Sequence, residues 1–344
     1  MIKIIGSTFA KNSQWYIDEK NLLEIIARQI NLKFPKQKNL LISLTWFGPQ
    51  FENSDFYQIQ YQKNFDNVFF LSSVDAPMIT YNQINDIIKV LSVSNSYLLG
   101  NFETQYQFNF ISTLLPKYFQ LYDVKDLELT DAKYLYMNLN RKPRQHRAEF
   151  VDKLKKENLV NFGLVSLGKN EIAYSKKSTN DECLLVDQDP DYDIQGNWGM
   201  DDSFGIVHDI HTLGNLQFWS SHFLNIVGET EFNPWDPMFI TEKTWKPILG
   251  LRPFVINGQT KIYQYLRDNG FKTFESYFNN IELENIPEYQ VHDSIIEVIK
   301  FLTTLNKSQL HELYEKMKPD LIFNRNRFFE FASEQKYLIE NLFV

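Results

Sequence analysis

The stretch FITEKTWKPILGLRPFVI, residues 239–256, predicts a helix followed by a strand. Thr241 is a good N-cap, and the helical pattern that follows ends at a glycine. The next run, PFVING at 253–258, is short and apolar, which is typical of a buried strand. The helix start also carries Glu242 and Lys243, so a hydroxyl, a carboxylate and an ammonium follow one another where a cap alone needs one polar group.

Short apolar runs and helical patterns alternate on both sides of this stretch. Strand–helix–strand order of this kind predicts parallel sheets with helices on their faces. Further strands are predicted at 2–6, 40–46, 67–75, 96–102, 133–140, 162–168 and 223–230. Further helices are predicted at 21–34, 83–94, 147–159, 260–270, 293–305, 308–321, 326–335 and 336–342.

The order of these elements predicts two Rossmann-like α/β domains in series. The polar segment 123–131 is the expected connection. We therefore expect one α/β domain over 1–128, a second over 129–325, and C-terminal helices over 326–344 that cross back to the first. Two facing domains of this kind form a cleft at the carboxyl ends of their strands, where ligands bind.

Composition and charge narrow the class of protein. Of the 344 residues, 43% are hydrophobic and 23% are charged, which is typical of a globular chain. The single cysteine, Cys183, excludes an intramolecular disulfide and fits a reducing compartment. A signal peptide and a run of roughly 18 apolar residues are both missing, so we expect a cytoplasmic protein without a membrane partner. The net charge of −8 argues against a general nucleic-acid-binding surface.

The start of the 241–250 helix has two interpretations. Thr241 and Glu242 fit an ordinary capped helix, because a carboxylate near a helix N-terminus is favourable. Lys243 opposes the helix dipole and is better explained by a phosphate bound at the helix start. Glu242 would then accept hydrogen bonds from ribose or sugar hydroxyls. The spacing alone leaves both interpretations open.

Two more polar patches follow predicted strands. Seven of the sixteen residues from Arg141 to Lys156 are lysine or arginine. Arg144 and Arg147 stand near the predicted helix start and are candidates for a phosphate site, because a guanidinium binds phosphate through paired hydrogen bonds. Neither GxGxxG nor GxxxxGK[ST] occurs here, which argues against a redox dinucleotide site and a P-loop. Glu229, at the end of a predicted strand, is either a ligand for hydroxyls or a solvated loop charge.

Together the patches resemble the donor-binding domain of GT-B glycosyltransferases, and they are most similar to the fucosyltransferase-like families. The resemblance lies in VGET at 227–230, TEKTW at 241–245 and RPFVI at 252–256. It covers roughly residues 133–280 and extends to glycosyltransferase-like proteins of bacteriophages. It implies two Rossmann-like domains facing a cleft, and a nucleotide-diphosphate sugar as co-substrate with no other cofactor.

The resemblance also implies roles for individual residues. Arg147 and Lys243 would neutralise the donor diphosphate. Glu242 would hold the ribose or the sugar, and Glu229 would hold the sugar. The Asn-Ser that follows this glutamate in the family is replaced here by Thr-Glu, so fucose is not implied.

The acceptor side needs a carboxylate base if the enzyme inverts the anomeric centre, as we expect. Glu103, and after it Asp75, stand at the ends of predicted strands in the first domain. Cations and a helix N-terminus stabilise a leaving diphosphate without a metal, so we expect no metal site. Two metal-binding alternatives are the acidic run DQDPDYD at 187–193 and VHDIH at 207–211.

We therefore expect a glycosyltransferase that moves a sugar from a nucleotide-diphosphate sugar to a hydroxyl acceptor. The acceptor stays open between a hydroxymethylated pyrimidine in phage DNA and a glycan, and a phage protein would work in the host cytoplasm. The alternative is a non-catalytic nucleotide- or glycan-binding protein on the same scaffold. A metal-dependent phosphatase or nuclease would need the acidic run, and the oligomeric state is left open.

Overall fold

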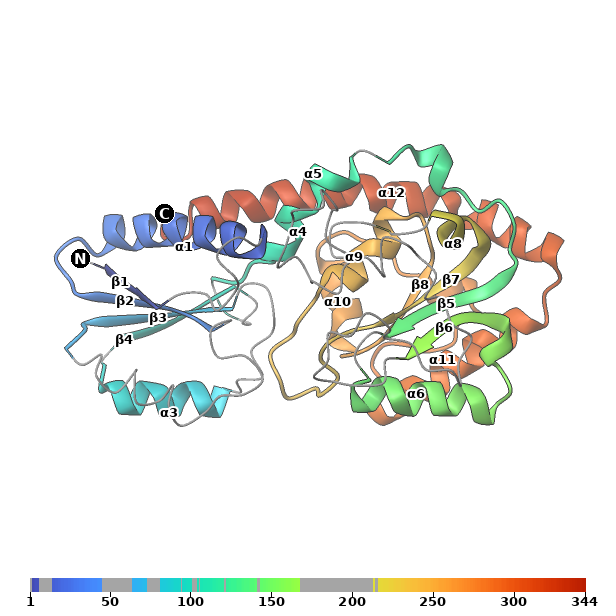
Figure 1. Cartoon of the computed structure of the whole chain (residues 1–344), viewed down its shortest axis with the longest axis horizontal. Helices are drawn as coiled ribbons and strands as arrows, with labels where there is room; N and C mark the ends of the chain where they lie inside the picture. The colour runs from blue at the N-terminus through green and yellow to red at the C-terminus, as the bar shows by residue number, and fades with distance from the viewer. Residues whose placement is uncertain are drawn as a thin grey trace.

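A computed structural model describes residues 2–5, 14–44, 64–72, 81–93, 95–100, 104, 106–120, 122–140, 143–167, 213 and 216–344. These residues form two four-stranded parallel β-sheets flanked by helices (Figure 1). The predicted α/β class is confirmed. None of the described helices is long and apolar enough to span a bilayer.

The first sheet has its strands in chain order, and each neighbouring pair is parallel. Successive side chains of a strand point to opposite faces. Leu41 and Phe69 pack with helix α1, whereas Leu40 and Phe70 pack with helix α3 on the other face. The strands are β1 (Ile2–Ile5), β2 (Asn39–Ser43), β3 (Asn67–Ser72) and β4 (Asn95–Gly100), and the helices are α1 (Gln14–Lys33) and α3 (Tyr81–Leu91).

The second sheet reverses its direction of winding. Its order is β6-β5-β7-β8, so the chain passes from β5 to β6 and then returns to the other side of β5. Ligands of open parallel sheets bind at such a switch point, beyond the carboxyl ends of the strands. The strands are β5 (Tyr134–Asn140), β6 (Gly163–Leu167), β7 (His222–Gly228) and β8 (Phe254–Asn257).

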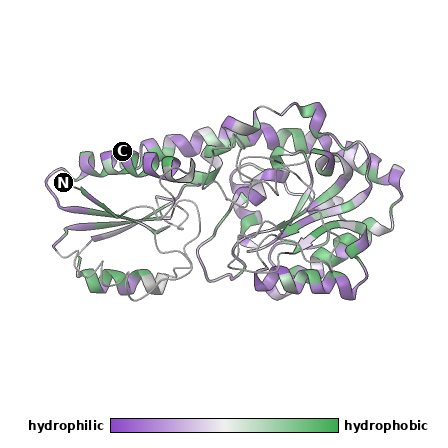
Figure 2. Ribbon diagram, viewed as in Figure 1, coloured by the Kyte–Doolittle hydropathy of each residue, from purple (hydrophilic) through white to green (hydrophobic). Residues whose placement is uncertain are grey.

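Helices cover both faces of the second sheet (Figure 1). On one face lie α6 (Gln145–Lys156) and α11 (Glu288–Thr303), and on the other lie α9 (Glu242–Leu249) and α12 (Lys307–Glu340). Hydrophobic residues line the strands and recur in the helices beside them (Figure 2). The remaining elements are α4 (Phe110–Leu114), α5 (Pro116–Phe119), α8 (Leu216–Ser221), α10 (Lys261–Asp268) and the 3-10 turns η2 (Val124–Leu127), η3 (Val160–Phe162) and η6 (Glu275–Tyr277).

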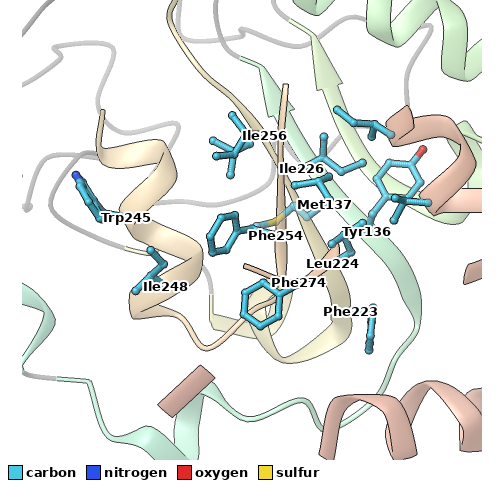
Figure 3. Packing of buried hydrophobic residues seen from close by; sticks show 14 of the residues in the cluster. Tyr136, Met137, Phe223, Leu224, Ile226, Trp245, Ile248, Phe254, Ile256 and Phe274 are labelled. Carbon is cyan, nitrogen blue, oxygen red and sulfur yellow. The ribbon is translucent and has the colours of Figure 1, made fainter. Parts of the chain in front are cut away.

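Trp245 fixes α9 to the second core. Its side chain is fully buried, and its ring lies 5.5 Å from that of Phe271 and 5.3 Å from those of Phe328 and Phe331. Figure 3 shows part of the core between this helix and strands β7 and β8. Trp245 is therefore a core residue, and its packing sets the position of the polar residues that precede it at the helix start.

Helix α12 differs from the sequence-based prediction. The patterns predicted three separate helices, but the structure has one helix of 34 residues that continues through Pro319. Met317 and Leu321 are buried on either side of the proline, and this packing holds the helix together where the proline lacks an N–H donor. The helix extends over both sheets (Figure 1). Near its end, Nε2 of Gln29 in α1 donates to the Glu340 carbonyl at 2.5 Å.

Candidate functional site

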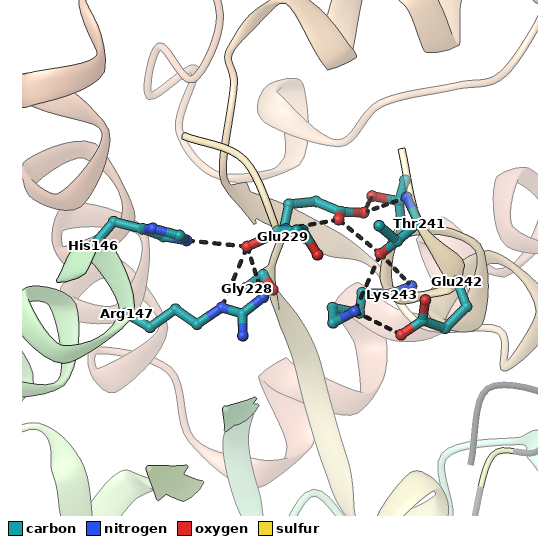
Figure 4. Close-up of polar contacts among 9 residues, drawn as sticks. His146, Arg147, Gly228, Glu229, Thr241, Glu242 and Lys243 are labelled. Carbon is teal, nitrogen blue, oxygen red and sulfur yellow. Dashed lines mark hydrogen bonds and ion pairs between the residues drawn. The ribbon is translucent and has the colours of Figure 1, made fainter. Parts of the chain in front are cut away.

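The candidate site lies at the switch point of the second sheet. Strand β7 ends at Gly228, and the next residue, Glu229, lies between the starts of helices α6 and α9 (Figure 4). Helix N-termini carry unpaired N–H groups and a partial positive charge. The fold therefore brings the predicted residues of all three polar patches to the same end of the sheet.

The Glu229 carboxylate is fully occupied by the protein itself. Its Oε1 accepts from the Thr241 amide at 3.1 Å and the Thr244 hydroxyl at 2.6 Å. Its Oε2 accepts from the Thr241 hydroxyl at 2.7 Å and the Thr230 amide at 3.1 Å. The side chain is fully buried. In this conformation Glu229 connects the end of β7 to the first turn of α9. Its carboxylate has no acceptor left for the sugar that it was predicted to bind.

Arg147 also serves the end of β7. It is 3% exposed, and its Nη2 donates to the carbonyls of Gly228 and Glu229, each at 2.8 Å. Its Nε donates to the same Glu229 carbonyl at 3.2 Å. These contacts point the guanidinium at backbone carbonyls (Figure 4). Arg147, the expected phosphate ligand, therefore holds the strand end in place.

His146 completes this support. Its Nε2 donates to the Glu229 carbonyl at 3.0 Å, because a carbonyl oxygen only accepts. Its ring stacks on Phe232, with centroids 5.0 Å apart and planes at 14°. Burial, reinforced by the charge of Arg147, lowers the pKa of His146 to about 3. The imidazole is therefore neutral near pH 7.

The start of α9 combines a cap with an ion pair. The Thr241 side chain accepts from the Lys243 amide at 3.3 Å, as expected for an N-cap. The Lys243 ammonium lies 2.6 Å from Oε1 of Glu242 and 3.4 Å from the Thr241 hydroxyl. The Lys243 side chain is one-third exposed. Glu242 offsets the unfavourable position of this lysine, and the ammonium stays within reach of solvent.

Arg144 and Glu231 face each other across the same strand end. Arg144 is the N-cap residue of α6 and makes no side-chain cap. Its Nη1 lies 3.7 Å from Oε1 of Glu231, and the two side chains are 24% and 13% exposed. Burial raises the pKa of Glu231 to about 7, although Arg144 acts in the opposite direction. Sequence reasoning gave Glu231 no role, and the available signal was a second acidic residue just beyond the strand.

Two buried asparagines, Asn138 and Asn140, lie at the end of β5. Nδ2 of Asn140 donates to Oδ1 of Asn138 at 2.5 Å, and Nδ2 of Asn138 donates to the Ile226 carbonyl at 2.9 Å. A Cβ on Gly228 would lie 2.4 Å from Oδ1 of Asn140. A side chain at the glycine of VGET would therefore have to displace the amide group of Asn140. The sequence did not indicate these buried asparagine contacts.

The loop between β7 and α9 is held by residues at and just before the start of α10. Nε2 of Gln259 donates to the carbonyls of Asn233 and Asp236 at 2.7 and 3.1 Å. The Lys261 ammonium donates to the Asp236 carbonyl at 2.8 Å. This fixed loop carries Trp235 with 86% of its surface exposed.

Some predicted residues lie outside the described part of the chain. They include both candidate bases, Glu103 and Asp75, the runs at 187–193 and 207–211, and Cys183. Among the residues that are described, His, Cys, Asp and Glu form no group of three or more that could hold a metal ion. The structure thus brings together Arg144, Arg147, Glu229, Thr241, Glu242 and Lys243 at one strand end.

The chain matches no protein-family model, no curated protein and no solved structure. The interpretation of the site therefore depends on its geometry and on the chemistry of its side chains.

Proposed function

We propose that the protein is a glycosyltransferase that binds the diphosphate of a nucleotide sugar at the β5–β7 switch point. The observation that carries this proposal is the pair of partly exposed cations at the starts of two helices. Arg144 precedes α6 and Lys243 lies in the first turn of α9, on either side of the end of β7. A diphosphate placed between them would meet two side-chain charges and two helix dipoles.

The same groups suit the chemistry of sugar transfer. Breaking the bond between the sugar and the diphosphate leaves negative charge on the phosphate oxygens. Fixed cations and backbone N–H groups stabilise such charge without any reorganisation during the reaction. In this proposal Lys243 exchanges its contact with Glu242 for a phosphate oxygen, and the released Glu242 carboxylate accepts hydrogen bonds from the ribose or the sugar. Glu229 and Arg147 hold the two helix starts and the strand end in position.

The proposal places the acceptor on the side of the first sheet, in a GT-B arrangement of two Rossmann-like domains. Glu103 and Asp75 remain the proposed bases, because both follow strands of that sheet in the sequence. The acceptor is a hydroxyl of a hydroxymethylated pyrimidine in DNA or of a glycan. The proposed reaction uses no metal and inverts the anomeric centre.

A thermal-shift screen with UDP, GDP, ADP and CMP, with and without EDTA, tests the proposal. A ligand that binds only the folded state raises the melting midpoint. We expect one diphosphate to do so with or without EDTA. Failure of every nucleotide to shift the midpoint contradicts the proposal and favours a non-catalytic glycan binder. A shift that EDTA abolishes contradicts the metal-independent mechanism.

Variants locate the binding site. Lys243→Ala and Arg144→Ala should each lose the ligand-induced shift, while the midpoint without ligand changes little because both side chains are partly exposed. The control is Lys307→Ala, whose lysine also pairs with a carboxylate, at 3.0 Å from Asp131, far along the chain. Arg147→Ala should weaken nucleotide binding too, but it also removes the support of β7 and lowers stability.

A further inference from the structure

Glu231 has hydrogen-bonding capacity that the protein does not use. Its side chain is only 13% exposed, and its Oε1 is buried without a hydrogen-bond partner among the described residues. The nearest cation, Nη1 of Arg144, is 3.7 Å away, which is beyond hydrogen-bonding distance. Buried polar atoms nearly always have partners, and an unpartnered one is costly. This carboxylate therefore differs from the groups that stabilise the fold.

The nearby Glu229 differs from Glu231 in its hydrogen bonding. The two glutamates are two residues apart at the end of the same strand, yet the Glu229 carboxylate accepts four hydrogen bonds from the protein. Arg144 makes no side-chain cap to α6, and its guanidinium is directed at Glu231 instead. A carboxylate and a guanidinium thus face each other at 3.7 Å, and Oε1 of the carboxylate has no hydrogen-bond partner among the described residues.

We propose that Glu231 and Arg144 bind the junction between the sugar and the diphosphate of the donor, an assignment that rests on the proposed function. Glu231 accepts hydrogen bonds from sugar hydroxyls, and Arg144 donates to the adjoining phosphate. This division follows from their chemistry, because a carboxylate accepts from hydroxyls and a guanidinium matches phosphate oxygens. The sugar contact predicted for Glu229 thus belongs to the glutamate two positions later in this proposal.

The surroundings of Glu231 make this contact sensitive to pH. The charged groups that face it are Arg144 and Arg147 from α6, Asp236 from its own loop and Glu229 from the end of β7. Burial raises the pKa of Glu231 to about 7, and Asp236 and Glu229 add to this effect while the two arginines oppose it. Only the ionised carboxylate gives charge-assisted hydrogen bonds to hydroxyls. Donor binding should therefore strengthen as the pH rises through 7.

Matched pairs of ligands isolate the sugar contact. Titration calorimetry with UDP and UDP-glucose, and with GDP and GDP-mannose, compares each nucleotide with and without a sugar. We use wild type, Glu231→Gln and the control Glu297→Gln, whose glutamate is 59% exposed on α11. At pH 8, wild type and the control should bind the nucleotide sugar more tightly than the free nucleotide. Glu231→Gln should lose about tenfold in affinity for the nucleotide sugar and keep its affinity for the free nucleotide.

The pH profile supplies a second readout. The esterified diphosphate of a nucleotide sugar has no proton that titrates near pH 7, so a pH dependence there belongs to the protein. Wild type should bind the nucleotide sugar about tenfold more weakly at pH 6 than at pH 8, because a group of pKa near 7 is mostly protonated at pH 6. Glu231→Gln should show a flat profile. Melting midpoints of all variants check that each one is folded.

The outcomes separate the two proposals. If wild type binds the free nucleotide but Glu231→Gln keeps wild-type affinity and pH dependence for the nucleotide sugar, the Glu231 assignment is wrong and the transferase proposal stands. If wild type gains nothing from the sugar, the assignment is also wrong. If wild type binds neither member of either pair, and no nucleotide of the thermal-shift screen raises its melting midpoint, both proposals are overturned.

Discussion

Glu229 and Thr241 are joined by two hydrogen bonds, from the threonine amide at 3.1 Å and from its hydroxyl at 2.7 Å. The contact connects the first residue after β7 to the residue that caps α9. It determines where the first turn of α9 lies relative to the end of the strand. The position of Lys243 therefore depends on a carboxylate that itself has no free acceptor.

Glu229→Gln should lower the free energy of unfolding by about 2–3 kcal/mol, because an amide nitrogen would face buried donors in place of an acceptor. Urea denaturation at pH 8 measures the change. Glu231→Gln is the matched control, since it removes a largely buried charge whose Oε1 has no hydrogen-bond partner among the described residues, and it should not destabilise the protein at this pH. Equal losses in the two variants would contradict the different roles of these glutamates.

Gly228→Ala should destabilise the protein by about 1–3 kcal/mol through steric overlap. The added Cβ would lie 2.4 Å from Oδ1 of Asn140, and the glycines with positive φ among the described residues are Gly100 and Gly270 only, so the conflict is one of space. The double variant with Asn140→Ala should lose less stability than the sum of the single losses, because it removes the overlapping oxygen. Chemical denaturation of the three variants gives this coupling, and strictly additive losses would place the overlap elsewhere.

Two buried histidines should make stability fall in mild acid. Burial lowers the pKa values of His146 and His222 from 6.5 to about 3, with nearby arginines acting in the same direction. Between these pH values the unfolded chain binds protons that the folded protein does not, so the free energy of unfolding falls as the pH falls. Burial raises the pKa of Glu231 from its ordinary value of 4.5 to about 7. Between these pH values the folded state binds the extra proton, so the contribution of Glu231 to the free energy of unfolding rises as the pH falls.

The His222→Asn variant isolates one of these contributions. His222 donates from Nδ1 to the Phe218 carbonyl at 2.6 Å, and an asparagine amide supplies a similar donor. Denaturation series from pH 4.5 to 7.5 give the free energy of unfolding as a function of pH. Below pH 6.5 the slope of this curve should be smaller in the variant than in wild type by about 1.4 kcal/mol per pH unit, which corresponds to one proton. His311→Asn, on the exposed side of α12, is the control for the replacement of a histidine by an asparagine. An unchanged slope in His222→Asn would show that this imidazole is charged in the fold.

Apolar periodicity predicted the strands of both sheets and the helices that flank them. The reason is that the spacing of apolar residues along the chain follows the period of the element and shows which of its faces are buried. The Thr241 cap was also predictable, because a cap accepts hydrogen bonds from backbone amides only two or three residues away and is therefore a local feature of the sequence. Helix α12 shows the limit of local patterns. Pro319 interrupts the sequence signal, but tertiary packing of Met317 and Leu321 continues the helix.

The polar contacts of the site could not be predicted in the same way. The sequence placed Glu229, Arg147 and Lys243 at strand and helix ends, and the structure brings them together there. Which atom satisfies which partner depends on distances between segments some 80 residues apart, such as that from Arg147 to the Glu229 carbonyl. Spacing along the chain carries no information on such distances. For this reason the hydrogen bonds that occupy the Glu229 carboxylate could not be predicted from the sequence.

The course of α12 has a consequence for synthesis of the protein. Ile339 and Phe343 pack in the same hydrophobic cluster as Leu23 of α1 and Phe69 of the first sheet. Domains generally fold as units while the chain emerges from the ribosome. Helix α1 and the first sheet are translated early, but part of the hydrophobic cluster that they form is completed by side chains made some 300 residues after α1. A chain that stops before residue 339 would lack these side chains, and this part of the cluster would stay exposed.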